Sequence, residues 1–417
     1  MIIKSASALV KRQSWLVRHR REFRTQSRSG APRLFVDVSE IIRHDAGTGI
    51  QRVVRAIWTQ LAQRDGRGFE LVPVYATEAH GYCRAPADFL HGSRESRRGP
   101  IQVNSGDKFL GLDLAAHLLP KYASQVRSWR EEGASLHIVV YDLLPLFRPE
   151  WFTSAAVRHF RRWVLLLARE ADQAICISNA VAQELRRELN GLPPERPQVT
   201  SIPLGCDIAA SLPSAGMRAE VAQVVADMRV RPTILMVGTI EPRKGYDAAL
   251  AAFEYLWRTR REDAPDFVIV GKAGWKTAAL QAQIRHHPEY GRRLRWLTGV
   301  SDEGLCRLYE SCSAFLITSH GEGFGLPLLE AAKHGCSILA RDLPVFREQC
   351  LPNVSYFSAD DPQALGEAIA GLPAGQPARS APLDLPTWSD CVNRLLAILG
   401  FDDAASPKLA QRAAAAG

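Results

Sequence analysis

The sequence predicts an α/β protein made of two doubly wound, Rossmann-like domains that face a central cleft. Short apolar runs alternate with amphipathic helical stretches, a pattern typical of parallel sheets with right-handed crossovers. The alternation occurs in two series, and residues 208–232, which show no strong strand pattern, lie between them. The length of 417 residues also suits two domains of roughly 100–200 residues each.

Each series places strands before loops that should reach the cleft, because ligands of such sheets bind beyond the carboxyl ends of the strands. In the first series, apolar runs predict strands over residues 33–39, 69–75 and 173–178 and a strand that ends in a loop over 135–145, and periodic apolar residues predict helices over 49–63, 155–171 and 179–189. Residues 198–207 close this series. In the second, we predict strands over residues 233–240, 266–272, 294–300, 314–319 and 337–342, and helices over 245–260, 302–312, 326–335 and 385–400.

The composition is that of an ordinary globular protein, with 46% apolar residues. The eight cysteines are dispersed without CxxC spacing, which argues against a zinc site or a thioredoxin-like motif. Their even number leaves disulfides open, but the length and the dispersion favour a reduced, cytoplasmic enzyme. No run approaches the roughly 18 apolar residues of a membrane-spanning helix.

Residues 1–30 carry most of the net charge. They hold eight basic residues and one acid, which gives +7 of a total of +8. Because apolar residues such as Trp15 are mixed with these cations, the arm is able to lie on an anionic membrane surface. A solvated tail explains the same residues. Nucleic-acid binding is disfavoured, because Trp15 and Phe23 lie outside any recognised module.

The stretch SHGEGFGLPLLEAAKHG, residues 319–335, follows a predicted strand and enters a predicted helix. Glycines such as Gly323 and Gly325 let the backbone approach a ligand, and the helix N-terminus favours an anion. A phosphate would repel Glu322, so we expect Glu322 to contact uncharged sugar hydroxyls and Glu330 to contact hydroxyls such as those of a ribose. Solvated acids favoured by the helix dipole are the structural alternative. The loop lacks the P-loop pattern.

A second loop, VGTIEPRKG at residues 237–245, also follows a predicted strand. It contains Gly238 and presents Arg243 and Lys244 side by side. Two cations at the carboxyl end of a strand suit a diphosphate, and a guanidinium can bind two of its oxygens at once. A pair of solvated surface cations is the alternative.

Two features of the first series point to the same cleft. Gly47 and Gly49 precede a predicted helix that carries Arg52 and Arg55 one turn apart, so its N-terminus could face the cleft. A plain tight turn explains these glycines as well. Asp142 ends a buried strand and is a candidate for binding or proton transfer, or it could cap the next helix.

Several of these motifs, in this order, resemble the retaining glycosyltransferases of family 4, which have the GT-B fold. Glu322 and Glu330 are similar to the E-x7-E motif of the family, and VGTIEPRKG resembles its phosphate-binding loop. Further similar segments are IPLGCD, SNAVAQEL and PTWSDCVNRLL at residues 202–207, 178–185 and 386–396. The resemblance covers roughly residues 33–400.

The resemblance implies a division of the chain and a role for each motif residue. The implied parts are a basic arm at 1–30, an acceptor-side domain at 31–212, a nucleotide-sugar domain at 213–385, a helix returning to the first domain at 386–400 and a tail at 401–417. Arg243 and Lys244 would neutralise the donor diphosphate. Glu330 would bind the ribose, and Glu322 would contact the transferred sugar. The other implied substrate-binding residues are Gly323, Phe324, Gly325, Leu326, Gly238, Gly47 and Gly49.

One departure from the family limits this transfer of roles. Many members have a His–Asp pair where this chain has Tyr141 and Asp142, so Asp142 alone is carried over as a catalytic residue. Because Arg243 and Lys244 supply preorganised charge and no Asp-x-Asp motif occurs in either loop, we expect no metal and no cofactor besides the nucleotide-sugar substrate.

The resemblance is strongest to members that use GDP-mannose, while UDP- and dTDP-sugars stay open as donors. It implies same-face attack on the donor, and an acceptor that is a lipid-linked glycan of bacterial surface polysaccharide synthesis. The basic arm would then hold the enzyme on the inner face of the cell membrane. We expect no nucleic-acid partner.

An NAD-dependent oxidoreductase is the alternative from a different class. The glycine loop and the doubly wound pattern fit it, and Asp342 roughly takes the place of an acidic ribose-binding residue. It leaves the adjacent cations and the paired glutamates unexplained. An inactive glycosyltransferase-like scaffold is a further alternative, which the intact glutamates and cations disfavour.

Overall fold

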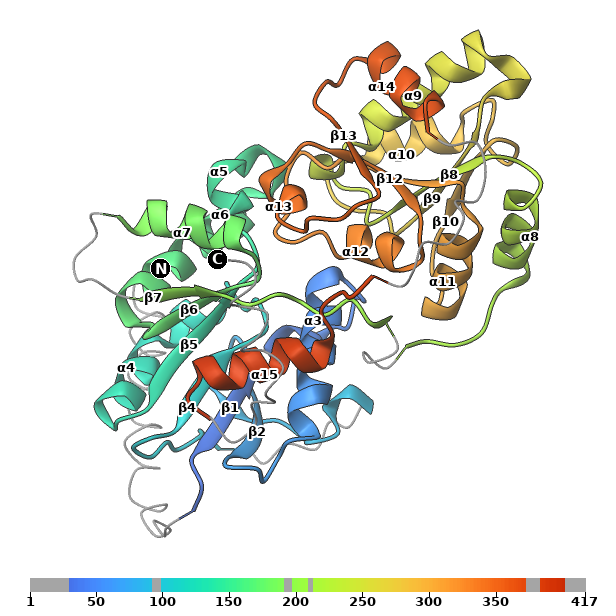
Figure 1. Cartoon of the computed structure of the whole chain (residues 1–417). Coiled ribbons are helices and arrows are strands. Elements are labelled where there is room, and N and C mark those ends of the chain that lie inside the picture. Colours follow the sequence, from blue (N-terminus) through green and yellow to red (C-terminus); the bar gives the residue numbers. More distant parts are fainter. Residues whose placement is uncertain (1–29, 92–98, 191–196, 209–212, 373–382, 402–417) are drawn as a thin grey trace.

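The protein is described by a computed structural model over residues 30–91, 99–190, 197–208, 213–372 and 383–401. Figure 1 shows two α/β domains, each built around one central sheet. The chain passes to the second domain after β7 (Gln198–Ser201), and its last helix, α15 (Trp388–Ile398), lies beside the first domain. The predicted architecture of two doubly wound domains is therefore confirmed.

The first domain contains a seven-stranded sheet in the order β3-β2-β1-β4-β5-β6-β7. β3 is antiparallel to β2, and all other neighbouring strands are parallel. The first six strands along the chain are β1 (Arg33–Asp37), β2 (Glu70–Tyr75), β3 (Cys83–Arg84), β4 (Lys108–Gly111), β5 (Ser135–Val140) and β6 (Gln173–Cys176). The helices are α2 (Ser39–Arg43), α3 (Gly49–Ala62), α4 (Ala123–Glu131), α5 (Leu144–Phe147), α6 (Ser154–Glu170) and α7 (Asn179–Leu189).

Side chains that alternate along the strands bury both faces of this sheet. Leu34 and Val36 of β1 share a core with α3 and α15, whereas Phe35 between them shares a core with α4, α6 and α7. This is the period of two that a strand imposes. The continuous apolar runs of the sequence thus reflect strands that are covered on both sides.

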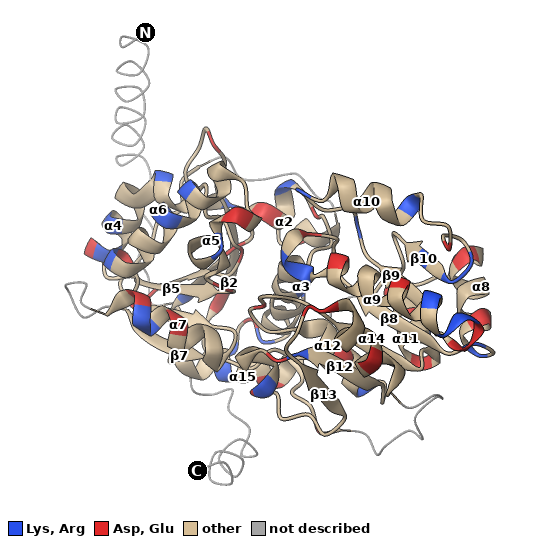
Figure 2. Cartoon of the chain, turned by 90° about the horizontal axis from the view of Figure 1, so that it is seen from above, with Lys and Arg blue, Asp and Glu red and all other residues tan. Residues whose placement is uncertain are grey.

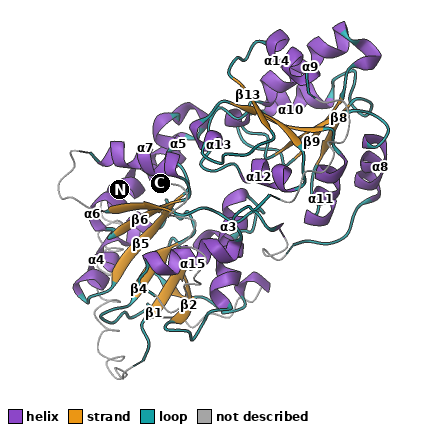
Figure 3. Ribbon diagram, viewed as in Figure 1, coloured by secondary structure: helices purple, strands orange, loops and turns teal. Residues whose placement is uncertain are grey.

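The second domain contains a six-stranded parallel sheet in the order β10-β9-β8-β11-β12-β13. Figure 3 shows both sheets with their flanking helices. The strands are β8 (Thr233–Val237), β9 (Asp266–Val270), β10 (Leu294–Leu297), β11 (Ala314–Ile317), β12 (Ser337–Arg341) and β13 (Val354–Phe357). The helices are α8 (Ala219–Met228), α9 (Tyr246–Thr259), α10 (Ala278–Arg285), α11 (Asp302–Ser311), α12 (Leu326–Lys333), α13 (Pro344–Arg347) and α14 (Pro362–Ala370).

Local signals in the sequence set the starts of two helices of the first domain. At α3, the Thr48 hydroxyl accepts from the Gln51 N–H at 3.3 Å, and the Gln51 side chain accepts from the Thr48 N–H at 3.2 Å. At α7, the Ser178 hydroxyl accepts from the Val181 N–H at 3.1 Å. These caps satisfy N–H groups that a helix start leaves free.

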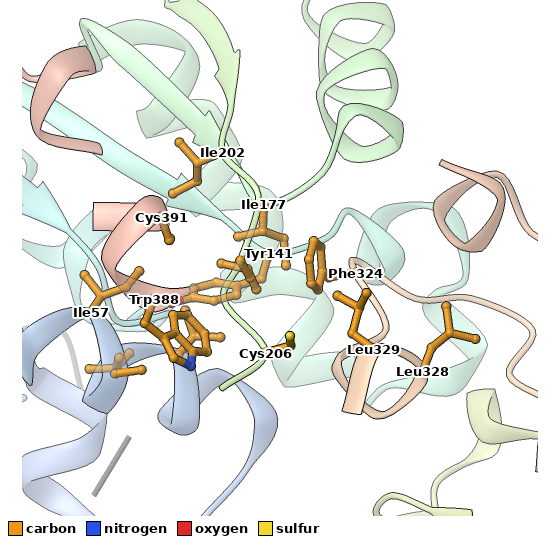
Figure 4. Close-up of a cluster of buried hydrophobic side chains, with 14 of the residues drawn as sticks. Ile57, Tyr141, Ile177, Ile202, Cys206, Phe324, Leu328, Leu329, Trp388 and Cys391 are labelled. Carbon is orange, nitrogen blue, oxygen red and sulfur yellow. The ribbon is translucent and has the colours of Figure 1, made fainter. Parts of the chain in front are cut away.

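One hydrophobic cluster continues from the first domain into the second. Phe324 and Leu329 of the second domain belong to the same buried cluster as Tyr141 and Ile177 of the first (Figure 4). Trp388 of α15 belongs to it as well. Phe324, which belongs to the glycine loop of residues 319–335, is therefore part of the core between the domains.

α15 packs against α3 of the first domain. Arg64, just after α3, donates to the Ser389 hydroxyl at 2.8 Å and to the Asn393 side-chain oxygen at 3.0 Å. A Cβ on Gly205 would lie 2.2 Å from the backbone nitrogen of Trp388. Glycine in the IPLGCD segment thus lets the connection between the domains approach the last helix.

The structure also contains elements that the sequence pattern missed. α8 lies inside residues 208–232, which we interpreted only as a connection, and it buries Val221 and Val225. The pattern also misses β4, the central strand of the first sheet, whose sequence KFLG contains only two large apolar residues, Phe109 and Leu110. The strand predicted over 135–145 ends at Val140, because Pro145 lies in the first turn of α5.

Within the described residues, no helix is both long and apolar enough to cross a membrane. All eight cysteines are free thiols, and the two nearest sulfur atoms, of Cys312 and Cys336, are 3.7 Å apart. Residues 1–29 lie outside the described part of the chain, so a membrane-surface role for the arm stays a prediction.

Candidate active site

Glu322 lies between β11 and α12, and three donors surround its carboxylate. One oxygen accepts from Lys244 Nζ at 2.5 Å and from the Ser319 hydroxyl at 2.7 Å. The other accepts from the Arg243 guanidinium at 2.6 Å. Arg243 also pairs with Glu241 at 2.9 Å. We call these five residues the Glu322 cluster, and all of them belong to the second domain.

The charges within the Glu322 cluster compensate one another. Burial disfavours ionised Glu322, but Arg243 and Lys244 outweigh this effect and lower its pKa to about 2. Burial and the neighbouring Arg243 lower the pKa of Lys244, although Glu322 and Glu241 oppose them. Burial also disfavours the charge on Arg243, yet Glu322 and Glu241 raise its pKa. The cluster therefore holds two cations beside carboxylates in a buried position.

Neighbouring strands bring the two loops of the cluster together. β8 pairs in parallel with β11, so the loops at their carboxyl ends start side by side. Gly245, with φ of 67°, ends the turn that carries Arg243 and Lys244. A Cβ at this position would lie 2.5 Å from the Thr318 carbonyl, so glycine permits the close approach. The sequence placed both loops at one cleft, and the structure shows that their side chains contact each other.

Glu330, on α12, forms a second group of buried charges. Its carboxylate accepts from Arg52 of α3 and, at 3.0 Å, from the Tyr309 hydroxyl. Arg52 also donates to Asp302 at 2.9 Å. We call these four residues the Glu330 cluster. Because Arg52 belongs to the first domain and the others to the second, the cluster joins the two domains. Burial raises the pKa of Glu330, and Arg52 offsets only part of this effect.

The two residues that follow β5, Tyr141 and Asp142, have different hydrogen-bond partners. Tyr141 is buried and donates its hydroxyl to the Leu112 carbonyl at 2.7 Å, so it is part of the first domain's core. Asp142 accepts from the Leu144 N–H at 3.1 Å, but the N-cap residue of α5 is Leu143, so Asp142 is not the N-cap that the alternative required. A Cβ on Gly323, the residue after Glu322, would lie 3.3 Å from the Asp142 Cβ, so Asp142 lies near the Glu322 cluster. Burial raises the pKa of Asp142, and the charge of Arg243 opposes this effect.

The glycines around Glu322 contact the first domain. A Cβ on Gly323 would lie 1.9 Å from the Tyr141 carbonyl, and one on Gly321 would lie 2.8 Å from the Leu144 side chain. Gly325 has φ of 92° and begins α12. Close approach of the two domains therefore accounts for Gly321 and Gly323, whatever the loop binds. The role of Gly323 and Gly325 in binding a sugar or phosphate stays a prediction.

The remaining predicted substrate-binding residues have different surroundings. A Cβ on Gly47, whose φ is 59°, would lie 3.7 Å from the amino group of Lys272, in the second domain. Gly49 begins α3, and a Cβ there would meet no atom within 4 Å. Gly238 directly follows β8. Leu326 is the first residue of α12 and is partly buried, while the neighbouring Phe324 side chain lies in the core.

Sequence reasoning missed a set of contacts from the loop after β9. Lys272, Trp275 and Lys276 each donate side-chain hydrogen bonds to backbone carbonyls of the first domain. The acceptors are the carbonyls of Ala46, Trp151, Glu150 and Phe152. Since backbone carbonyls carry no residue-type signal, the sequence offers no way to pair these positions.

Among the described residues, no group of three or more His, Cys, Asp or Glu side chains could hold a metal ion. Asp342, which the oxidoreductase alternative requires, pairs with Arg347 at 2.8 Å instead. The acid that would bind the ribose in the oxidoreductase alternative therefore already forms an ion pair with Arg347 of α13.

Known proteins with similar sequences are glycosyltransferases. Residues 223–381 match the family of glycosyl transferases group 1. The chain is 39% identical over 345 residues to the serotype-specific mannosyltransferase WbdA of Escherichia coli, which is 81% of this chain and 41% of that protein. It is 27% identical over 205 residues to the E. coli O-antigen chain mannosyltransferase B, covering 49% of this chain and 52% of that protein. The chain thus spans about two fifths of the length of WbdA.

Solved structures show which fold the chain has. Anabaena HepE in complex with UDP and glucose superposes with a TM-score of 0.60 at 16% identity, over 88% of this chain and 99% of that one. Sucrose-phosphate synthase of Thermosynechococcus elongatus superposes with a TM-score of 0.58 at 17% identity, over 93% of this chain and 100% of that one. The chain therefore has the GT-B fold, and its residues 223–381 match the family of glycosyl transferases group 1.

Proposed function

We propose that the chain is a retaining glycosyltransferase that moves mannose from GDP-mannose to a lipid-linked glycan in the synthesis of a bacterial surface polysaccharide. The Glu322 cluster carries the proposal, because it holds Arg243 and Lys244 beside an ionised carboxylate at the carboxyl ends of β8 and β11. The mannosyltransferase names of WbdA and of O-antigen chain mannosyltransferase B support mannose as the transferred sugar.

In the proposed reaction, the bond between the anomeric carbon and the donor diphosphate breaks. A bond from the acceptor hydroxyl oxygen to the same carbon forms on the same face, and the hydroxyl proton passes to an oxygen of the departing diphosphate. Arg243 and Lys244 stabilise the charge on this leaving group, which is the part that a metal ion could otherwise play. Because they are already fixed by Glu322, little reorganisation is needed at the moment of reaction.

The acids of the cleft are assigned to hydroxyl groups. Glu322 accepts hydrogen bonds from the transferred mannose, whose anomeric carbon gains oxocarbenium character as the bond breaks. Each carboxylate oxygen has more than one acceptor position, so Glu330 can bind ribose hydroxyls while Arg52 and Tyr309 still hold it. Asp142, beside the Glu322 cluster, is a second acceptor for a sugar hydroxyl.

A thermal-shift panel of GDP, UDP, dTDP, ADP and NAD, with and without EDTA, tests the donor side. A nucleotide at about 100 times its dissociation constant should stabilise the protein by about 2.7 kcal/mol. We expect a shift with GDP alone that EDTA does not change. A shift with UDP or dTDP would keep the transferase and replace the donor. Absence of any shift with the three sugar-carrier diphosphates would contradict the proposal.

An NMR assay with GDP-mannose and a mannose-terminated oligosaccharide tests the stereochemistry. We expect the new glycosidic bond to have the α configuration of the donor. A β product would contradict the retaining mechanism while leaving the donor assignment intact.

A further inference from the structure

The outer face of α6 consists of four arginines and one leucine. Arg158, Arg161, Arg162, Leu165 and Arg169 follow one another at intervals of one to four positions, which places them on one side of the helix. All five are exposed, and half of the Leu165 side chain is accessible to solvent. We call these five residues the α6 face. It carries no acidic residue.

Packing on the other side fixes this face toward solvent. Phe160, Trp163 and Leu167 of α6 are buried in the core that also holds α4 and α7. Turning the helix to cover the arginines would expose these large apolar side chains. The α6 face is therefore a permanent part of the surface of the first domain, and Figure 2 shows basic residues along this helix.

Among the described residues, the arginines of the α6 face have no acidic ion-pair partner. In the part of the chain that the structure describes, no Asp or Glu oxygen lies within 4.0 Å of their guanidinium groups. The nearest acid in sequence, Glu170, is taken by Arg127 and Arg130 of α4, at 2.9 Å and 3.5 Å. Elsewhere on the surface, arginines such as Arg260 and Arg307 have a carboxylate partner. Within the described residues, the positive charge of the α6 face thus has no carboxylate ion-pair partner.

An exposed apolar residue and a contact between the domains lie in the segment just before α6. Phe147, the last residue of the short helix before α6, is a large hydrophobic residue that is exposed, as Leu165 is. The turn that joins Phe147 to α6 also reaches the second domain, since the Trp151 carbonyl accepts from the Trp275 side chain at 2.7 Å. The α6 face therefore begins next to a contact between the two domains.

We propose that the α6 face, together with Phe147, docks on an anionic lipid membrane. Lipid phosphates complement unpaired arginines, and the headgroup region accommodates single apolar side chains such as Leu165 and Phe147. A nucleic acid would match the charge but would leave these two apolar groups without a partner. This surface is separate from the basic arm of residues 1–30, and the inference holds whichever sugar donor the enzyme uses.

Co-sedimentation of the full-length protein with vesicles tests the proposal. Vesicles of phosphatidylcholine alone are compared with vesicles containing roughly one third phosphatidylglycerol, at ionic strengths of about 0.05 M and 0.3 M. We expect binding to the anionic vesicles, weakened at the higher salt. The triple variant R158E/R161E/R162E should bind them at least about tenfold more weakly, and Leu165→Ser should weaken binding less.

A matched control separates a specific surface from net charge. The variant R67E/R229E/R258E makes the same change in charge at exposed arginines elsewhere on the surface, and it should bind the vesicles nearly as the native protein does. A variant with the arm cations replaced by glutamine should keep the part of the binding that the α6 face supplies. Circular dichroism and the GDP thermal shift establish that each variant is folded, and the thermal shift reports the donor site independently.

Three results would overturn the proposal. The α6 triple variant could bind as tightly as the native protein, or the control triple could lose as much binding. The arm variant alone could lose all binding, which would assign the membrane contact to residues 1–30 only. Finally, duplex DNA at the same salt could bind the native protein more tightly than the vesicles do and depend on the α6 arginines, which would identify a nucleic-acid surface.

Discussion

The Glu322 and Glu330 clusters place similar carboxylates in different electrostatic surroundings. Glu322 contacts two cations of its own domain, and its pKa is lowered to about 2. Glu330 contacts one cation, Arg52, which comes from the other domain, and its pKa is raised because burial outweighs that contact. Eight positions separate the two glutamates along the chain, yet only Glu330 depends on how the two domains meet.

This difference suggests a division of labour between the two ends of the donor. The Glu322 cluster is complete within the second domain, so under the proposed function it needs no residue of the first domain to bind the sugar and the diphosphate. The Glu330 cluster is complete only when α3 lies against the second domain. Nucleotide binding at Glu330 is therefore expected to be coupled to the arrangement of the domains.

Glu322→Gln should have the largest effect, because it leaves Arg243 and Lys244 buried without their main counterion. Loss of one partner of a buried ion pair costs about 3–5 kcal/mol of unfolding free energy. Transfer should fall by at least about 10²–10³-fold, the loss typical of a preorganised electrostatic group. Urea unfolding and steady-state kinetics with GDP-mannose measure the two effects. Glu150→Gln, at an exposed acid, is the control, and near-native turnover of Glu322→Gln would exclude Glu322 from the site.

The pH dependence of stability should have opposite signs at the two glutamates. The folded-state pKa of Glu322, about 2, lies below its ordinary value of 4.5, so the stability from its ionisation is complete above about pH 4.5. This contribution, about 3 kcal/mol, should be lost as the pH falls from about 4.5 to about 2. Burial raises the pKa of Glu330, so its protonation in the folded state adds stability at low pH, and this gain is lost as the pH rises through the folded-state pKa.

Urea unfolding of the native protein, Glu322→Gln and Glu330→Gln across the acidic range checks this prediction. As the pH falls, the difference in unfolding free energy between the native protein and Glu322→Gln should shrink. The unfolding free energy of the native protein should rise relative to that of Glu330→Gln. Parallel curves for the two variants would mean that the two carboxylates share one electrostatic environment.

Gly323→Ala should have a smaller effect that acts through the contact between the domains. The new Cβ would lie 1.9 Å from the Tyr141 carbonyl, so the domains must separate to relieve the overlap. Overpacking of this kind costs about 1–3 kcal/mol. Transfer should fall, whereas Gly49→Ala, with no atom within 4 Å of its Cβ, should be nearly neutral. Equal kinetics for the two variants would show that this close approach is not needed for transfer.

Arg52→Gln should have the smallest effect of the series. It removes the link between the domains at Glu330, but Arg52 is 28% exposed and the Tyr309 hydroxyl still serves the carboxylate. We expect a loss of about 1–2 kcal/mol in unfolding free energy, discounted for solvent screening. Arg55→Gln is the matched control one turn away, because Arg55 pairs only with Asp45 of its own domain in the described structure. Equal losses for Arg52→Gln and Arg55→Gln would show that the interdomain pair adds nothing to stability.

The sequence predicted the site residues that lie at the ends of neighbouring strands, but it did not predict contacts between segments that are far apart in the chain. Arg243, Lys244 and Glu322 were predicted at one cleft because strand ends of a parallel sheet converge, and the structure brings these side chains into contact. The pairing of Arg52 with Glu330 joins positions 278 residues apart. No periodicity or spacing within the chain encodes such a contact.

The surrounding structure also determines the positions of two side chains that the sequence alone could not place. The resemblance implies that the backbone of Phe324 lines the sugar and the phosphate, which stays a prediction, and the structure adds that its side chain fills the core between the domains. Tyr141 directly follows a strand and precedes a candidate catalytic acid, yet its hydroxyl donates a hydrogen bond to the Leu112 carbonyl. In both cases the position of the side chain is set by packing against segments that are distant in the sequence.

The affinity for GDP of Glu322→Gln and Glu330→Gln, measured by calorimetry, tests the central claim most directly. GDP has the ribose and the diphosphate but no sugar to transfer. We predict that Glu330→Gln binds GDP about tenfold or more weakly, a loss of about 1.4 kcal/mol. Glu322→Gln should bind GDP at least as tightly as the native protein, because the cations lose their internal counterion, while its transfer activity is lost. Native affinity in Glu330→Gln together with weakened binding in Glu322→Gln would contradict the division of roles between the two clusters.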